Sequence, residues 1–197
     1  MLKIGLTGNM GSGKTTVSKI FEILGVPVFY ADDAAKEVMI TDGDLINSIK
    51  SAFGEVSYLD DGSLNRKHIA AIVFNDDIQL KKLNSMVHPA VFKAFDAWVK
   101  NQDGTPYILK EAALLFESDS YKFCDYTIMV QAPLETRIQR VMRRDGFSRD
   151  EVERRNANQF SDERKTQLAD YVIKNDDTEL VIPQVLKLHE KFSSLVH

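Results

Sequence analysis

Eight residues near the start of the chain have the types and the spacing of a loop that binds the phosphates of a nucleotide. They are Gly8, Asn9, Met10, Gly11, Ser12, Gly13, Lys14 and Thr15. Glycines allow so tight a turn that successive backbone N–H groups point inward, where they bind phosphate oxygens. Lys14 is then expected to reach the β- and γ-phosphates, and the hydroxyl of Thr15 to bind Mg²⁺.

The segments on either side decide whether this pattern is more than a chance match in a glycine-rich turn. Residues 2–6 before the loop are mostly apolar, which is typical of a strand buried on both faces. After the loop, apolar residues recur at helical spacing at Val17, Ile20, Phe21 and Leu24. Strand, loop and helix form the context that the motif requires. The sequence therefore predicts that the residues from Gly8 to Thr16 bind the phosphates of a nucleoside triphosphate.

Carboxylates lie directly after two further predicted strands, where ligands bind in open α/β sheets. Asp32 and Asp33 follow a strand over residues 26–30, and Glu111 follows a strand over residues 105–110. We predict that Asp32 accepts a proton from a substrate hydroxyl, orders Mg²⁺ through water, or does both. Asp33 is predicted to cap the helix that begins one residue later. Glu111 is predicted to help hold the metal shell.

Residues 34–100 show repeated helical spacing of apolar side chains and no strand pattern. A crossover between parallel strands needs only one helix, so the excess predicts a helical insertion over residues 34–103 that binds substrate. His88-Pro89 is expected to break the helical run, because proline biases the preceding residue away from helical backbone angles. His88 is then either aimed at a ligand or a structural histidine.

Basic residues gather in residues 137–165, with nine Lys or Arg against six Asp or Glu in a chain of net charge −4. Two solvated helices laced with ion pairs would explain such a run. Because the run follows a phosphate loop, we favour a lid that brings one or two arginines to the phosphates and excludes water. The nucleotide-binding core is then residues 1–33, 104–136 and 166–197.

A last predicted strand spans residues 170–174, and the turn that begins at Asn175 can cradle an adenine ring. The chain contains no Asn-Lys-x-Asp sequence of the kind that recognises guanine. ATP is therefore the predicted nucleotide, with Mg²⁺ as its metal.

Composition predicts one soluble α/β protein with small insertions, because 44% of the 197 residues are hydrophobic and 27% are charged. The net charge of −4 argues against binding to nucleic acid or a membrane surface, since such proteins usually carry a basic excess. A single cysteine, Cys124, and the lack of a leader or long apolar span predict a cytoplasmic protein. We expect small-molecule partners and a monomer or small homo-oligomer.

Short motifs spread over nearly the whole chain resemble, in their order, those of the dephospho-CoA kinase family. They are Gly5-Leu6-Thr7-Gly8, Tyr30-Ala31-Asp32, His88-Pro89, Glu111-Ala112-Ala113-Leu114-Leu115-Phe116-Glu117, Arg155 with Gln159, and Ala169-Asp170 with Asn175. The phosphate loop marks only the P-loop superfamily, whereas the Leu-Leu-Phe-Glu run with His-Pro upstream is more specific. The resemblance implies transfer of the γ-phosphoryl group of ATP to the ribose 3′-hydroxyl of dephospho-CoA.

The resemblance also implies a fold and a set of site residues. The fold is the α/β, three-layer P-loop NTPase fold, with a five-stranded parallel sheet, a helical insertion for dephospho-CoA and a helical lid. Catalytic roles are implied for Asp32, Lys14 and Arg140. ATP binding is implied for the loop together with Arg144 and Asn175. Substrate binding is implied for Asp32, His88, Leu115, Glu117 and Arg155.

Two positions depart from the family pattern. Tyr30 and Glu111 both stand where the family usually has aspartate, and the longer arm of Glu111 puts a direct metal contact there in question. Two rival functions also fit the phosphate loop. One is a nucleotide-dependent switch or ATPase that has no phosphoryl acceptor, and the other is a different small-molecule or nucleoside kinase on the same scaffold.

Overall fold

The computed structural model describes residues 1–73 and 76–195, and the chain divides into two compact units. The first unit contains Met1–Tyr30 together with Gln102–His197, and the second contains Ala31–Asn101. The chain therefore passes between the units twice, once at each end of a continuous insertion.

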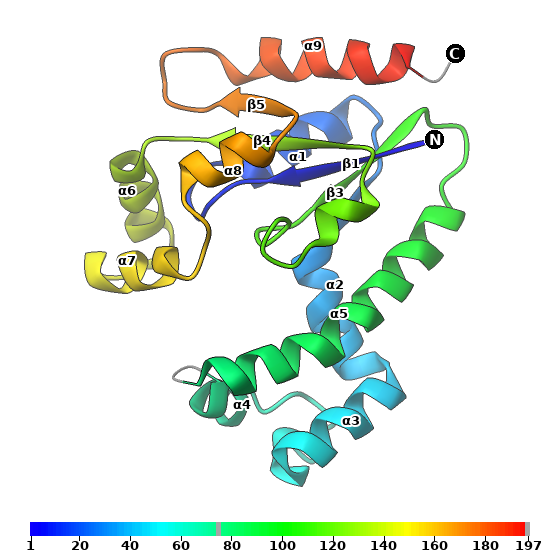
Figure 1. Ribbon diagram of the computed structural model, residues 1–197, viewed down its shortest axis with the longest axis vertical. Helices are drawn as coiled ribbons and strands as arrows, with labels where there is room; N and C mark the ends of the chain where they lie inside the picture. The colour runs from blue at the N-terminus through cyan, green and yellow to red at the C-terminus, as the bar shows by residue number, and fades with distance from the viewer. Residues whose placement is uncertain (74–75, 196–197) are drawn as a thin grey trace. The chain divides into compact units, whose positions relative to one another are not determined.

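The first unit is built on a parallel sheet of five strands in the order β2-β3-β1-β4-β5 (Figure 1). The strands are β1 (Leu2–Thr7), β2 (Val28–Tyr30), β3 (Tyr107–Glu111), β4 (Tyr126–Gln131) and β5 (Tyr171–Lys174). All four neighbouring pairs are parallel. The predicted five-stranded parallel sheet is confirmed, although β2 is shorter than expected because Val26 and Pro27 lie outside it.

Side chains of β1 alternate between the two faces of the sheet. Ile4 and Leu6 are fully buried in a core with Phe21 of the helix α1 (Lys14–Ile23) and with Phe192. Gly5 points the other way, where a Cβ atom would lie 2.7 Å from Cδ2 of Leu115. Both faces of the central strand are thus covered, which explains the apolar run at the start of the chain.

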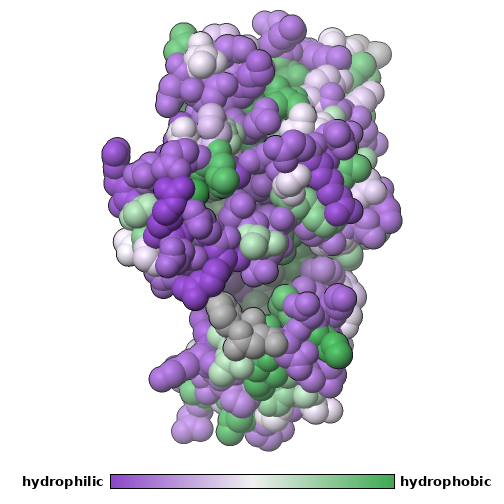
Figure 2. All heavy atoms as spheres, turned by 60° about the vertical axis from the view of Figure 1, so that its left-hand side comes forward, coloured by the Kyte–Doolittle hydropathy of each residue, from purple (hydrophilic) through white to green (hydrophobic). Residues whose placement is uncertain are grey.

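The helices of this unit flank the sheet on both sides. They are α1 (Lys14–Ile23), η2 (Ser120–Phe123), α6 (Leu134–Asp145), α7 (Arg149–Ala157), α8 (Asp162–Leu168) and α9 (Val181–Ser194). Figure 1 shows α8 in front of the strands and α1 behind them. The surface around α6 and α7 is dominated by hydrophilic residues (Figure 2). No helix within the described ranges has the length and apolar character needed to cross a membrane.

The second unit is mainly helical, as predicted. Its elements are α2 (Ala31–Thr41), α3 (Gly43–Phe53), η1 (Glu55–Ser57), α4 (Arg66–Val73) and α5 (Asp77–Lys100). Helix α5 packs against α2, α3 and α4.

Helix α5 continues through Pro89, so the predicted break at His88-Pro89 is wrong. The buried side chains Val87, Val91 and Phe95 lie four residues apart on one face of the helix. Burial of this face outweighs the local cost of a proline, which removes one backbone hydrogen bond. Tertiary packing has overridden a local sequence signal.

Helix α2 begins at Ala31, so the prediction that Asp33 caps a helix starting one residue later is wrong. Asp32 and Asp33 both lie in the first turn, where negative charge is stabilised by the helix dipole. Asp33 also pairs with Lys36 on the next turn, 2.6 Å away and largely exposed.

Candidate active site

Several backbone N–H groups of the phosphate loop have no hydrogen-bond acceptor among the described residues. Two of its N–H groups, those of Met10 and Ser12, donate to protein oxygens 3.0 Å away. The N–H groups of Gly11, Gly13 and Thr15 have no such acceptor in the described ranges. These donors surround the N-terminus of α1, where the helix dipole adds positive potential. The loop therefore has the chemistry of an anion site.

Gly11 is required by both the backbone and its surroundings. Its φ of 80° lies in the left-handed region that side chains rarely adopt. A Cβ atom at this position would also lie 2.5 Å from the backbone carbonyl oxygen of Arg137 in α6. The loop can therefore approach α6 this closely only with glycine there.

Lys14 follows the loop and lies beside the last residue of β3. Its Nζ is 3.8 Å from Oε1 of Glu111, and the two side chains are 13% and 9% exposed. An ammonium group near the loop amides is placed to neutralise phosphate charge. Glu111 faces Tyr30 across the β2–β3 register. Burial and the nearby Glu22 raise the pKa of the Tyr30 phenol to about 12, so this substituted side chain stays neutral.

Thr15 offers an exposed hydroxyl at the start of α1 that makes no hydrogen bond within the described part of the chain. The described residues contain no cluster of three or more His, Cys, Asp or Glu side chains. Mg²⁺ in nucleotide sites commonly takes one or two protein ligands, with phosphates and waters completing its shell. The exposed hydroxyl of Thr15 fits such a sparse site, whereas the Glu111 carboxylate lies beside the Lys14 ammonium.

A pocket of about 520 Å³ lies between α6 and the turn after β5. Its lining residues are Glu135, Thr136, Gln139, Arg140, Arg143, Arg144 and Asp177. Arg140 NH1 donates to the Asn175 carbonyl oxygen over 3.2 Å, and the Asn175 amide donates to the Ser12 carbonyl oxygen over 2.8 Å. The pocket is thus tied to the phosphate loop, and its volume suits a small ligand.

A second lysine lies in the same unit and is completely buried. Lys165 Nζ donates to the Ala113 carbonyl oxygen over 2.8 Å and to Oε1 of Glu117 over 2.9 Å. Burial lowers the pKa of Lys165, whereas the bond to Glu117 opposes that shift. The charge of Lys14 lowers the pKa of Lys165 further, so the two ammonium groups are near enough to interact. Each is paired with a carboxylate, Lys165 with Glu117 and Lys14 with Glu111.

Comparison with known proteins agrees with these features. The family model for dephospho-CoA kinase matches residues 2–180. The chain is 41% identical over 180 residues to a dephospho-CoA kinase of Salinibacter ruber, covering 90% of each chain. It is 37% identical over 187 residues to one of Bacteroides fragilis, covering 95% of this chain and 91% of that one. The chain belongs to the dephospho-CoA kinase family.

A solved dephospho-CoA kinase from Campylobacter jejuni shares the fold. The two structures have a TM-score of 0.71 at 26% identity, over 98% of this chain and 97% of that one. The predicted P-loop α/β fold is therefore confirmed, and ATP is the co-substrate that the dephospho-CoA kinase family implies.

Two site residues predicted from the dephospho-CoA kinase resemblance belong to the helical unit. Asp32 is exposed in the first turn of α2, two residues after the end of β2. His88 is half-buried in α5, with its ring centroid 6.5 Å from that of Phe92. The roles of Asp32 and His88 in catalysis and substrate binding remain predictions.

The remaining predicted residues lie in the first unit. The side chain of Leu115 has no exposed surface and fills the space beneath Gly5, and its role in substrate binding stays a prediction. Arg144 forms a two-pronged pair with Asp145 at 2.8 Å, and its side chain is 65% exposed. Arg155 stacks on Phe147, 4.2 Å from the ring centroid.

Three charged residues around the loop were missed by sequence analysis as individual sites. Arg137 is 3% exposed, Lys165 is fully buried, and Asp177 lies 3.6 Å from Arg140. Arg137 and Lys165 sit within a charge run that is normally solvated. Nothing in the local pattern separates a buried member of such a run from an exposed one.

Proposed function

We propose that this chain phosphorylates dephospho-CoA at its ribose 3′-hydroxyl, using the γ-phosphoryl group of ATP with Mg²⁺. The observation that carries the proposal is the phosphate loop, with its unoccupied N–H donors and Lys14, in a chain of the dephospho-CoA kinase family. Phosphoryl transfer depends mainly on positioning and on stabilising charge, which such a loop supplies.

The nucleotide end of the site is assigned from the first unit. The phosphates bind the N–H groups of the loop, Lys14 neutralises charge on the transferring group, and the Thr15 hydroxyl binds Mg²⁺. The base and ribose occupy the pocket beside Arg140, whose guanidinium is partly exposed and free to contact phosphate oxygens as well. Arg144 acts as a second cation on the same pocket.

Asp32 is the proposed general base for the acceptor hydroxyl and orders Mg²⁺ through water. Its exposed carboxylate sits in the first turn of α2, immediately after a strand of the nucleotide-binding sheet. The neighbouring Asp33 instead pairs with Lys36. Asp32→Asn should therefore lower kcat by about 10²–10⁴-fold with little change in ATP affinity. Asp33→Asn is the matched control and should leave kcat near the wild-type value.

The helical unit supplies the proposed binding surface for the acceptor. A pocket of about 600 Å³ within it has apolar walls from Met39, Ile40 and Leu64. Its charged lining residues are Lys36, Arg66, Asp33 and Glu37, and Lys36 is paired with Asp33. The apolar walls suit the pantetheine arm of dephospho-CoA, and Arg66 is the cation proposed to contact its diphosphate. Phe95 is 2% exposed and belongs to the core, so it offers no surface to the arm.

The choice of acceptor can be tested with a panel of dephospho-CoA, adenosine and AMP. Each is incubated with ATP and Mg²⁺, and ³¹P NMR locates the new phosphate. We expect a 3′-phosphomonoester on dephospho-CoA, much slower reaction with adenosine and no ADP from AMP. From residue 34 to residue 103 the chain has one arginine, Arg66, whereas kinases of nucleoside monophosphates usually use several on the acceptor phosphate. ADP formed from AMP as fast as CoA from dephospho-CoA would contradict the proposal.

Omission of the acceptor tests the rival function of a switch or ATPase. A kinase should hydrolyse ATP slowly until dephospho-CoA is added, whereas a switch would hydrolyse ATP equally with and without it. Lys14→Ala serves as the control for contaminating kinases, because it removes the loop cation from a partly buried position.

A further inference from the structure

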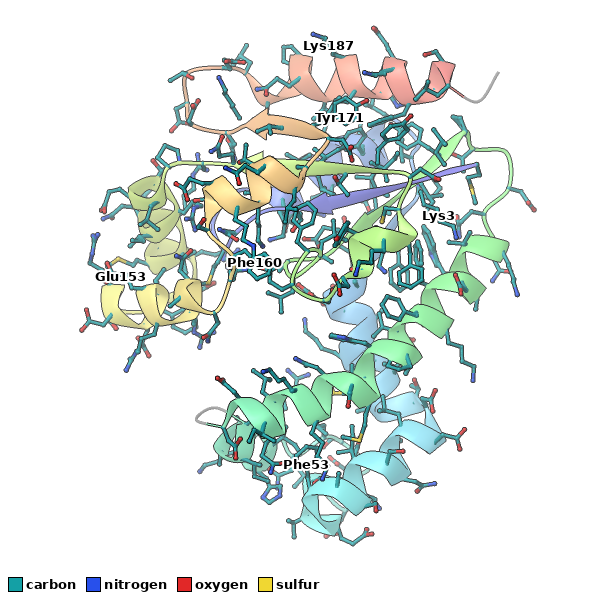
Figure 3. The ribbon with its side chains drawn as sticks, viewed as in Figure 1. Lys3, Phe53, Glu153, Phe160, Tyr171 and Lys187 are labelled. Atoms are coloured by element: carbon teal, nitrogen blue, oxygen red, sulfur yellow. The ribbon has the colours of Figure 1, made fainter. Side chains whose placement is uncertain are left out.

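The first half of the phosphate loop is attached by side chains to the segment that joins α7 and α8. Asn9 is 1% exposed, and its amide group donates twice. One bond goes to the Phe160 carbonyl oxygen over 3.0 Å, and the other to Oδ1 of Asp162 over 2.9 Å. Phe160 is labelled in Figure 3 on this joining segment. More than 150 residues of sequence separate the partners, so the attachment is purely tertiary.

The second oxygen of Asp162 anchors a buried arginine that also holds the loop. Arg137 NH2 donates to Oδ2 of Asp162 over 2.6 Å, and the two side chains are 4% and 15% exposed. Arg137 NH1 donates to the Met10 carbonyl oxygen over 3.2 Å and to Oδ1 of Asn156 over 2.7 Å. The Asp162 carboxylate thus connects Asn9 to Arg137, and Arg137 in turn donates a hydrogen bond to Met10.

The same segment also binds the backbone N–H of Met10, through Oε1 of Gln159 at 3.0 Å. Both polar groups of the Met10 backbone are therefore held by side chains. The next residue, Gly11, begins the set of N–H groups that have no protein acceptor in the described ranges. A shift of Asn9 and Met10 would consequently reorient the Gly11 N–H, the first of the N–H groups proposed to bind phosphate.

We propose that Asp162 and Arg137 act as positioning residues for ATP, by clamping Asn9 and Met10 in the conformation that binds phosphate. Asp162 is the centre of this clamp, because its two oxygens serve the loop and the arginine separately. The proposal rests on ATP being the nucleotide of the proposed function. It adds a coupling between the phosphate loop and the α7–α8 segment.

Direct titration of ATP, with no acceptor present, tests the clamp independently of the kinase assignment. Asn9→Gly removes two hydrogen bonds from the loop and keeps its backbone free to turn, and we expect ATP binding to weaken about 10-fold. Asp162→Asn cannot accept from both Asn9 and Arg137, and we expect a weakening of about 10-fold or more. Because both changes break one clamp, the double variant should bind ATP about as weakly as Asp162→Asn alone.

Asp150→Asn is the matched control, since it removes the same charge from an exposed position at the start of α7. Its ATP affinity should equal that of wild type. In steady-state assays the KM for dephospho-CoA should stay constant in all variants, while the KM for ATP rises. If these hydrogen bonds only stabilise the fold, the variants should have a lower Tm but an unchanged KM for ATP.

ATP affinities of Asn9→Gly and Asp162→Asn within about twofold of wild type would overturn the proposal. Equal weakening by Asp150→Asn would do the same. If Asp162→Asn does not fold, Asn9→Gly decides the matter alone, because it leaves the Arg137–Asp162 pair intact. If the wild-type protein binds ATP but does not phosphorylate dephospho-CoA, the proposed function is contradicted. That result would not contradict the positioning role of Asp162 and Arg137.

Discussion

Gly11→Ala is expected to lower both the stability of the fold and the catalytic rate. Gly25→Ala is the matched control, because it should lower stability alone. The φ angles of the two glycines are 80° and 82°. A Cβ atom at Gly25 would meet nothing within 4 Å, whereas one at Gly11 would lie 2.5 Å from the Arg137 carbonyl oxygen. Gly→Ala therefore makes the same chemical change in the same backbone conformation, and only the surroundings differ.

The shared cost follows from the backbone. Left-handed geometry disfavours alanine by about 1–2 kcal/mol, and the reduced freedom of the unfolded chain returns about 0.4–1 kcal/mol. Gly25→Ala should thus lose about 1 kcal/mol and lower Tm by about 2–4 °C. Its kcat/KM should match that of wild type, because Gly25 lies at the far end of α1 from the loop.

Gly11→Ala carries an additional steric cost. Normal carbon–oxygen contact requires the loop or α6 to move by roughly 1 Å. Arg137 resists such a movement, because its backbone N–H donates to the Pro133 carbonyl oxygen and its guanidinium to Ala132 and Asp162. Displacement of this size at a reacting centre commonly costs about 10²-fold in rate. Steady-state kinetics and thermal unfolding of both variants measure the two effects. A kcat/KM for Gly11→Ala within about threefold of that for Gly25→Ala would refute this reasoning.

Three further outcomes are expected. Arg140→Lys should raise the KM for ATP or lower kcat by about 10-fold or more, because it removes the planar guanidinium fork that can bond the Asn175 carbonyl and two phosphate oxygens in fixed directions. Unchanged kinetics would assign the phosphate contact to another residue. Burial raises the pKa of the Cys124 thiol to about 11, because the folded protein favours the neutral thiol over the thiolate. The contribution of this thiol to the free energy of unfolding is therefore present below pH 9 and is lost as the pH rises through 11. Alkylation at pH 8 should consequently be at least about 100-fold slower in the native protein than in denaturant, and equal rates would exclude a buried thiol. Lys165→Met should destabilise the fold by about 3–5 kcal/mol in urea unfolding, because Glu117 is left as an uncompensated carboxylate, and adding Glu117→Gln should recover part of that loss.

The strands were predictable because each is a short segment rich in apolar residues with polar, glycine or proline residues close to its end. The central residues of β1 and β4 are buried, so the middle of each strand is mostly apolar. The phosphate loop was predictable for a different reason, since its glycines are demanded by backbone geometry that few other residues adopt.

Helix ends and breaks were less predictable, because they depend on contacts outside the local sequence. Pro89 signals a break, yet the buried face of α5 keeps the helix continuous. Asp33 has the residue type of a cap, yet α2 starts directly after β2. In both cases local preferences of about 1–3 kcal/mol are smaller than the packing of a whole helix.

The buried polar contacts of the site could not be predicted at all. Arg137 and Asp162 lie 25 residues apart in a run of charges, most of which are exposed. Hydrogen bonds across such distances leave no periodic pattern in the sequence. Only the arrangement of α6 and α8 around the loop brings the two side chains together.

The central place of β1 in the sheet has a consequence for synthesis on the ribosome. Its two neighbours are β3 and β4, so the strand made first is flanked by segments that end at residues 111 and 131. At about 5–20 residues per second, about 6–25 s pass between the translation of β1 and that of the end of β4. The helical unit, a continuous stretch of chain, is complete during this interval and can fold first. Until then β1 is an apolar strand with both edges open, and we expect it to be the segment of the nascent chain that chaperones protect.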